Sequence, residues 1–103
     1  MRLLGIAIIL ALVSASASAQ NPVRHGRALL RANCGACHAV GSKGPSTHRA
    51  APPLRRLGRS FDLDDLPRLL SRGISAGHPD MPEVRFNEDD ARDVRAYLRS
   101  IQE

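Results

Sequence analysis

Hydrophobic residues recur every three to four positions in the last part of the chain, with polar and charged residues between them. This apolar stripe consists of Ala91, Val94, Leu98 and Ile101. Such spacing places the four side chains on one face of an α-helix. Asn87 is suited to cap the helix, and the acidic residues 88–90 would lie at its positive end. We therefore expect an amphipathic helix that begins after Asn87.

Two further helices are expected upstream. Asn21 and Pro22 can begin the first, because Asn caps helices and Pro suits the first helical position. The apolar positions of the second are Leu63, Leu66, Leu69 or Leu70, and Ile74. Asp64 can cap it, since Pro67 is tolerated only within the first turn. Residues 39–60 are expected to form an irregular loop, and strand patterns are absent, so the predicted fold class is all-α with about three helices and long loops.

The first nineteen residues have the features of a secretory signal peptide. A basic start precedes an unbroken apolar run over residues 3–13, and small residues follow. The eleven apolar residues are too few to cross a bilayer, which needs about 20, so a permanent membrane anchor is the weaker alternative. Ala19 is the expected cleavage position and Ala17 a second one. We therefore expect a signal peptide, residues 1–19, and one small domain, residues 20–103, exported to the periplasm.

Residues 34–38, with the sequence Cys-Gly-Ala-Cys-His, form the attachment signature for c-type haem. Residues three and four apart on one helical turn share a face, so Cys34, Cys37 and His38 can all address one flat macrocycle. The two thiols would become thioethers and the imidazole would bind the iron. The motif thus predicts one covalent haem c, attached through Cys34 and Cys37, with His38 as an iron ligand.

Other uses of a Cys-X-X-Cys pair fit the sequence less well. A structural zinc site needs four nitrogen or sulfur ligands, usually as two pairs, and the chain has no second Cys pair or His-X-His cluster. A thioredoxin-like dithiol needs a βαβ context, which the pattern does not supply. A plain disulfide stays open as an alternative, because export places the thiols in an oxidising compartment.

Met81 is the expected ligand on the side of the iron opposite to His38. It is the only Met in residues 20–103, and Pro79 and Pro82 lie close to it on either side. Fixed φ angles at these prolines reduce the entropy lost when the sulfur is aimed at iron. A neutral thioether favours ferrous iron and raises the reduction potential. The alternative ligands are His78, His25 and His48.

Charge and composition limit the partners. Residues 20–103 carry fourteen Lys and Arg against ten Asp and Glu, a net charge of +4. The basic residues are spread along the chain and are not interleaved with aromatic residues, so nucleic acid is not an expected partner. The positive charge is that of an ordinary solvated surface, or it steers the protein towards an acidic docking patch on a redox partner protein.

These motifs resemble those of the small class I cytochromes c, the monohaem electron carriers of bacterial periplasms and of mitochondria. The resemblance covers nearly all of residues 20–103. In that family a Gly, then an aromatic residue or Leu, and then the first haem Cys recur four residues apart on the first helix. The matching residues here are Gly26, Leu30 and Cys34. The resemblance implies the class I cytochrome c fold, with Tyr97 of the last helix packed near Gly26.

The family's Gly-Pro-X-Leu loop is similar to residues 51–54, with Ala51 in place of the usual Gly. This similarity implies that the carbonyl of Pro52 accepts the proton of His38 Nδ1. Such a bond would fix the tautomer of the imidazole and strengthen it as a ligand.

The resulting expectation is a periplasmic electron carrier and not an enzyme. Single electrons would pass through a six-coordinate haem with His38 and Met81 as axial ligands. Two alternatives stay open: a haem c subunit of a larger periplasmic oxidoreductase, and a five-coordinate haem sensor or peroxidase in which Met81 leaves the iron accessible. The chain would act as a monomer or as a subunit of a redox complex.

Overall fold

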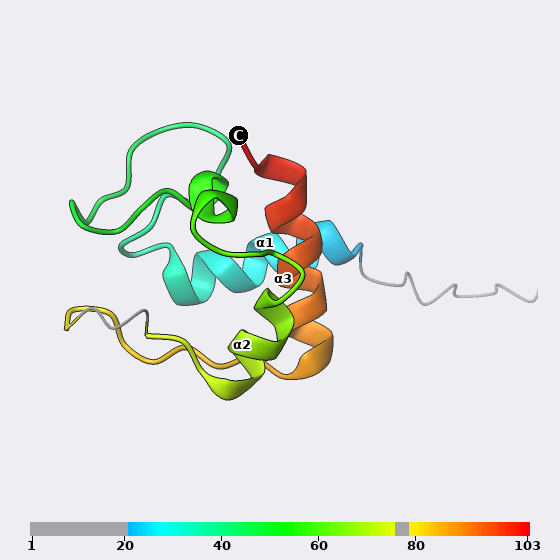
Figure 1. The fold of residues 1–103 in the computed structure, drawn as a ribbon. Coiled ribbons are helices and arrows are strands. Elements are labelled where there is room, and N and C mark those ends of the chain that lie inside the picture. Colours follow the sequence, from blue (N-terminus) through cyan, green and yellow to red (C-terminus); the bar gives the residue numbers. More distant parts are fainter. Residues whose placement is uncertain (1–20, 76–78) are drawn as a thin grey trace, which may run out of the picture.

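The computed structural model describes residues 21–75 and 79–103, and in these two ranges it contains three α-helices and one 3₁₀-helix (Figure 1). The helices are α1 (Pro22–Cys34), η1 (Leu54–Arg59), α2 (Leu66–Arg72) and α3 (Glu88–Ile101). The all-α fold predicted from the sequence is therefore confirmed. No helix in the described part of the chain is long and apolar enough to cross a membrane. The expected signal peptide, residues 1–19, lies outside the described residues.

The two longest helices begin where the sequence indicated. The side chain of Asn21 accepts hydrogen bonds from the backbone N–H groups of Val23 and Arg24, at 3.0 and 3.4 Å, and so caps α1. In the same way the Asn87 side chain accepts from the N–H of Asp90 at 2.8 Å and caps α3. Helix α2 begins one residue later than expected, because Asp65 and not Asp64 is its N-cap residue.

The expected irregular loop over residues 39–60 contains the short helix η1, which the sequence pattern did not predict. Leu54 and Leu57 are three residues apart, and a 3₁₀-helix with three residues per turn places them on one face. Leu54 is buried and Leu57 packs against the core from a partly buried position. Two apolar residues are too few to show a period, so the packing becomes visible only in the structure.

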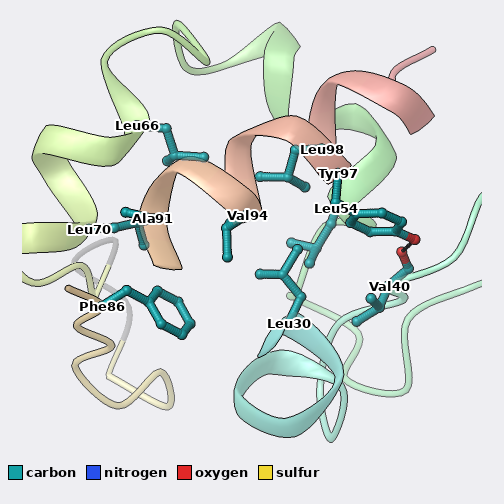
Figure 2. Packing of buried hydrophobic residues seen from close by; sticks show 10 residues of the cluster. All are labelled: Leu30, Val40, Leu54, Leu66, Leu70, Phe86, Ala91, Val94, Tyr97 and Leu98. Atoms are coloured by element: carbon teal, nitrogen blue, oxygen red, sulfur yellow. Dashed lines mark hydrogen bonds between the residues drawn. The ribbon is translucent and has the colours of Figure 1, made fainter. Parts of the chain in front are cut away.

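The hydrophobic core lies around α3, against which α1, η1 and α2 each pack buried leucines (Figure 2). Its ten buried hydrophobic residues are Leu30, Val40, Leu54, Leu66, Leu70, Phe86, Ala91, Val94, Tyr97 and Leu98. Helix α3 supplies Ala91 and Val94, which are fully buried, and Leu98, which is 1% exposed. The expected stripe of α3 is therefore the centre of the core, although Ile101 is only partly buried.

Helices α1 and α3 cross closely at Gly26, where the family resemblance implied a contact with the last helix. The nearest atoms to a side chain placed there would belong to the backbones of Asp93 and Val94. Tyr97 lies one turn further along α3, and its hydroxyl donates to the carbonyl of Val40 at 2.5 Å (Figure 2). The aromatic residue thus connects α3 to the segment that follows His38.

Candidate haem site

The segment from Cys34 to His38 continues the path of α1 for one more turn. The N–H of Cys37 donates to the Cys34 carbonyl at 3.2 Å, and the N–H of His38 donates to the same carbonyl at 2.9 Å. These are contacts between residues three and four apart, so the side chains of Cys34, Cys37 and His38 project from one side of the turn. All three are partly buried, and both thiols are free. Helix α1 therefore places the three residues of the motif together.

Burial, with a smaller effect of the neighbouring Cys37, raises the pKa of the Cys34 thiol from 9.0 to about 11. Removing this thiol from water disfavours its charged form. At neutral pH Cys34 is therefore a protonated thiol, which is a poor nucleophile and is slow to oxidise.

His38 is oriented by a hydrogen bond to Pro52. Its Nδ1 lies 2.7 Å from the carbonyl oxygen of Pro52, which can only accept, so Nδ1 carries the proton. This is the contact that the family resemblance implied. In the neutral imidazole the other nitrogen, Nε2, then keeps its lone pair and is the atom able to bind a metal.

The Pro52 carbonyl lies just before helix η1, and hydrogen bonds hold both ends of this helix in place. The N–H of Leu54 donates to the Ala39 carbonyl at 3.0 Å, next to His38. The side chain of Gln102 donates to the Leu54 carbonyl at 3.0 Å and accepts from the Gly58 N–H at 2.8 Å. Gln102 therefore joins the first and the fifth residue of η1. This role could not be predicted from the sequence pattern, because Gln102 follows the last periodic helix.

The adjacent Glu103 adds charged contacts to the same helix. Its carboxylate pairs with the guanidinium groups of Arg55 and Arg56, each at 3.3 Å, and its N–H donates to the Arg55 carbonyl at 3.0 Å. Arg55 is buried and also donates to the Gly44 carbonyl at 2.6 Å. This guanidinium thereby connects η1, the loop that precedes it, and the residues after α3.

Met81 is partly buried and belongs to a segment that leaves α2 and returns to α3. An antiparallel bridge closes the base of this segment, with two backbone hydrogen bonds of 2.8 Å between Ile74 and Val84. In Figure 1 this segment, coloured yellow, lies on the same side of the helices as the end of α1 and the loop of residues 39–53. The carboxylate of Asp80, next to Met81, lies 3.4 Å from Nε2 of His48 in that loop.

The structure thus brings the predicted site residues together in two ways. Backbone hydrogen bonds join Cys34 to Cys37 and His38, and the His38 ring is hydrogen-bonded to Pro52. Met81 is connected to this group only through its neighbour Asp80, which contacts His48. Within residues 21–75 and 79–103, no group of three or more His, Cys, Asp or Glu side chains is arranged to hold a metal ion.

Two of the three alternative histidine ligands, His25 and His48, make other contacts in the structure. His25 lies at the crossing of α1 and α3, where its Nδ1 is 2.7 Å from Asp93 and its Nε2 is 3.9 Å from Asp90. His48 uses one ring nitrogen towards Ala50 and the other towards Asp80. His78 lies outside the described residues. His25 and His48 would have to break these contacts before either could take the place expected for Met81, opposite to His38.

The donor set of this site fits a covalently attached haem. Two free thiols three residues apart can form two thioether links, and an adjacent imidazole with its Nδ1 proton held by a carbonyl offers Nε2 to iron. A partly buried thioether, Met81, lies in a segment on the same side of the molecule. An all-α domain with such a helix end has the architecture of a c-type cytochrome.

Comparison with known proteins agrees with this architecture. Residues 21–98 match the family model described as cytochrome c oxidase, cbb3-type, subunit III, and the chain therefore belongs to the cytochrome c family. Haem-based electron transfer is the activity that a cytochrome c domain implies. The chain is also similar to cytochrome c-552 of Bradyrhizobium diazoefficiens, with 28% identity over 103 residues that cover 99% of this chain and 97% of the relative. No solved structure matches it.

Proposed function

We propose that this protein is an exported electron carrier whose single haem is attached to Cys34 and Cys37 and ligated by His38 and Met81. The observation that carries the proposal is the 2.7 Å hydrogen bond from His38 Nδ1 to the Pro52 carbonyl, one residue after a pair of free thiols. This bond prepares Nε2 as a ligand before any metal arrives. Bound haem supplies a one-electron couple at its iron.

In this proposal each residue has a separate task. Cys34 and Cys37 hold the cofactor covalently, and the Pro52 carbonyl keeps His38 in one tautomer and one orientation. Met81 provides a neutral sulfur that stabilises the reduced form more than the oxidised form. With His38 and Met81 both bound to the iron, no coordination position would be left for a substrate, so the protein would act as a relay and not as an enzyme.

The test begins with the exported protein, produced in a host that matures c-type cytochromes. We expect its mass to exceed that of residues 20–103 by one haem, and its ferric absorption spectrum to show the weak band of a thioether–iron bond. A colourless protein without the added mass would overturn the proposal. Haem attachment without the thioether band, together with strong peroxidase activity towards hydrogen peroxide, would instead support the five-coordinate alternative.

A second candidate function is a haem subunit of a larger oxidoreductase. The description of the matching family model, a subunit of an oxidase, favours it. The chain also covers 97% of cytochrome c-552, so it matches a protein of nearly the same length, as expected if such a domain works by itself. Purification at native expression levels distinguishes the two, since a subunit would elute with its partners and a carrier would elute alone.

The net positive charge predicts that electron transfer to an acidic partner protein becomes slower as the salt concentration is raised.

A further inference from the structure

We infer that His48 is a positioning residue for Met81, because it connects the haem-attachment turn to the segment that carries the thioether. The inference rests on the proposed ligation of iron by Met81. It concerns a residue that the sequence offered only as an alternative ligand. The structure assigns it a different task, which is to hold a loop in place from outside the coordination sphere.

The contacts of His48 extend in two directions. Its backbone N–H donates to the Cys37 carbonyl at 3.0 Å, which fixes it to the turn that holds the motif. Its ring nitrogen Nε2 lies 3.4 Å from a carboxylate oxygen of Asp80, the residue directly before Met81. His48 is therefore a bridge between Cys37 and Asp80, which are 43 residues apart in the sequence.

Both ring nitrogens of His48 are committed by this arrangement. The N–H of Ala50 donates to Nδ1 at 3.1 Å, so Nδ1 presents a lone pair and the proton of the neutral ring resides on Nε2. The Asp80 carboxylate, which can only accept, has an oxygen 3.4 Å from this nitrogen. The local turn at Ala50 thus sets the tautomer that the bridge to Asp80 requires.

The contact between His48 and Asp80 lies close enough to Met81 to restrain the position of its sulfur. The segment that carries Met81 is closed at its base by Ile74 and Val84, several residues away from the thioether. A contact at Asp80 restrains the backbone one residue from Met81. The His48 side chain is 35% exposed and that of Asp80 is 65% exposed, so the effect of the bridge on ligand binding is modest.

Three substitutions separate the bridge from the local turn. His48→Asn keeps an acceptor near the place of Nδ1 for Ala50 but removes the group that faces Asp80. His48→Gln keeps an N–H near the place of Nε2 and should preserve the bridge. Asp80→Asn removes the charge on the other side. His25→Asn is the matched control, since it removes a His–Asp contact of the same chemistry at the crossing of α1 and α3.

The readouts, taken on the ferric haem-loaded protein, are the intensity of the thioether–iron band and the rate at which cyanide replaces the sulfur. We expect His48→Asn and Asp80→Asn each to raise that rate roughly two- to fivefold, which is the effect of losing one exposed charged contact. The double variant should exceed neither single variant, because both remove the same contact. His48→Gln and His25→Asn should stay close to the parent protein.

Two contrary results are distinguishable. If the parent protein shows the thioether band but His48→Asn and Asp80→Asn exchange cyanide at the parent rate, Met81 is a ligand and the bridge has no part in holding it. If the parent protein lacks the band, the proposed ligation fails, and the role of His48 fails with it. The spectrum of the parent protein therefore decides whether Met81 binds iron before any variant is made.

Discussion

Gly26 and Asp93 approach so closely that a Cβ atom at position 26 would lie 2.1 Å from the Asp93 carbonyl oxygen. The same Cβ atom would lie 2.9 Å from the Val94 nitrogen. Both neighbours are backbone atoms inside α3, which cannot move aside as the end of a flexible side chain can. The crossing of α1 and α3 therefore depends on the missing side chain, and Leu30 and Cys34 follow on the same helix.

We predict that Gly26→Ala destabilises the protein although Ala is the better helix former. Overpacking costs about 1–3 kcal/mol, and a contact of 2.1 Å with a backbone atom belongs to the upper part of that range. The cost therefore exceeds the gain of about 1 kcal/mol in helix propensity. The free energy of unfolding, measured by urea titration, is the appropriate readout. Gly41→Ala is the control, because a Cβ atom there meets nothing within 4 Å, and its effect should stay within about 0.5 kcal/mol. Equal stability of the two variants would contradict the close crossing.

Removing the hydroxyl of Tyr97 should also lower stability. Tyr97 is 5% exposed and Val40, whose carbonyl it donates to, is 7% exposed. Tyr97→Phe keeps the ring but leaves this carbonyl without its donor, and we expect a loss of about 1–3 kcal/mol in the free energy of unfolding. Ser100→Ala removes a hydroxyl that donates to a carbonyl of its own helix, and this partly buried local contact should matter little because the residue itself is exposed. A similar loss in both variants would argue against a special role for the Tyr97 contact.

The sequence predicted those parts of the fold that depend on local rules. Helix α3 was visible because its apolar residues repeat with the helical period, and Asn21 and Asn87 marked the helix starts because their side chains accept from free N–H groups. The bond between His38 and Pro52 could be expected from the family resemblance alone. In these cases the information lies within a few residues or in a known motif.

The parts that were missed depend on contacts between distant irregular segments. Helix η1 is stabilised by Gln102 and Glu103, which lie more than forty residues away and carry no periodic signal. The contact between His48 and Asp80 joins two loops, and neither residue is distinguished by its neighbours in the sequence. Such pairs follow from the way the helices place the loops, so they become apparent only after the helices are packed.

The proposed sixth ligand can be tested by Met81→Ala. Loss of the neutral thioether removes a preference for ferrous iron, so the reduction potential should fall, and cyanide or carbon monoxide should bind readily. Potentiometric titration and ligand-binding spectra measure both effects. Free N-acetylmethionine, added in excess, should restore part of the ferric thioether band, because it supplies the missing sulfur. An unchanged potential and unchanged access to ligands would assign the sixth position to another residue.

The raised pKa of Cys34 predicts a pH dependence in the reduced, haem-free chain. The folded thiol keeps its proton up to about pH 11, whereas the ordinary value is 9.0. Alkylation of Cys34, followed by mass spectrometry, should therefore keep accelerating up to pH 11 in the folded chain and level off near 9 in urea. If the thiol alkylates with the same pH profile in both states, burial does not control its ionisation.

The same shift couples the thiol to stability. Between pH 9 and 11 the unfolded thiol loses its proton first, so the folded state binds more protons and the free energy of unfolding falls as pH rises. The contribution of the protonated Cys34 thiol to the free energy of unfolding is complete below pH 9 and is lost as the pH rises to about 11. Urea titrations of the haem-free chain against Cys34→Ser isolate it, since Ser does not ionise in this range. In the haem-loaded protein the sulfur would be a thioether without a proton to lose, and this decline should therefore be absent there, which also tests the attachment of haem at Cys34.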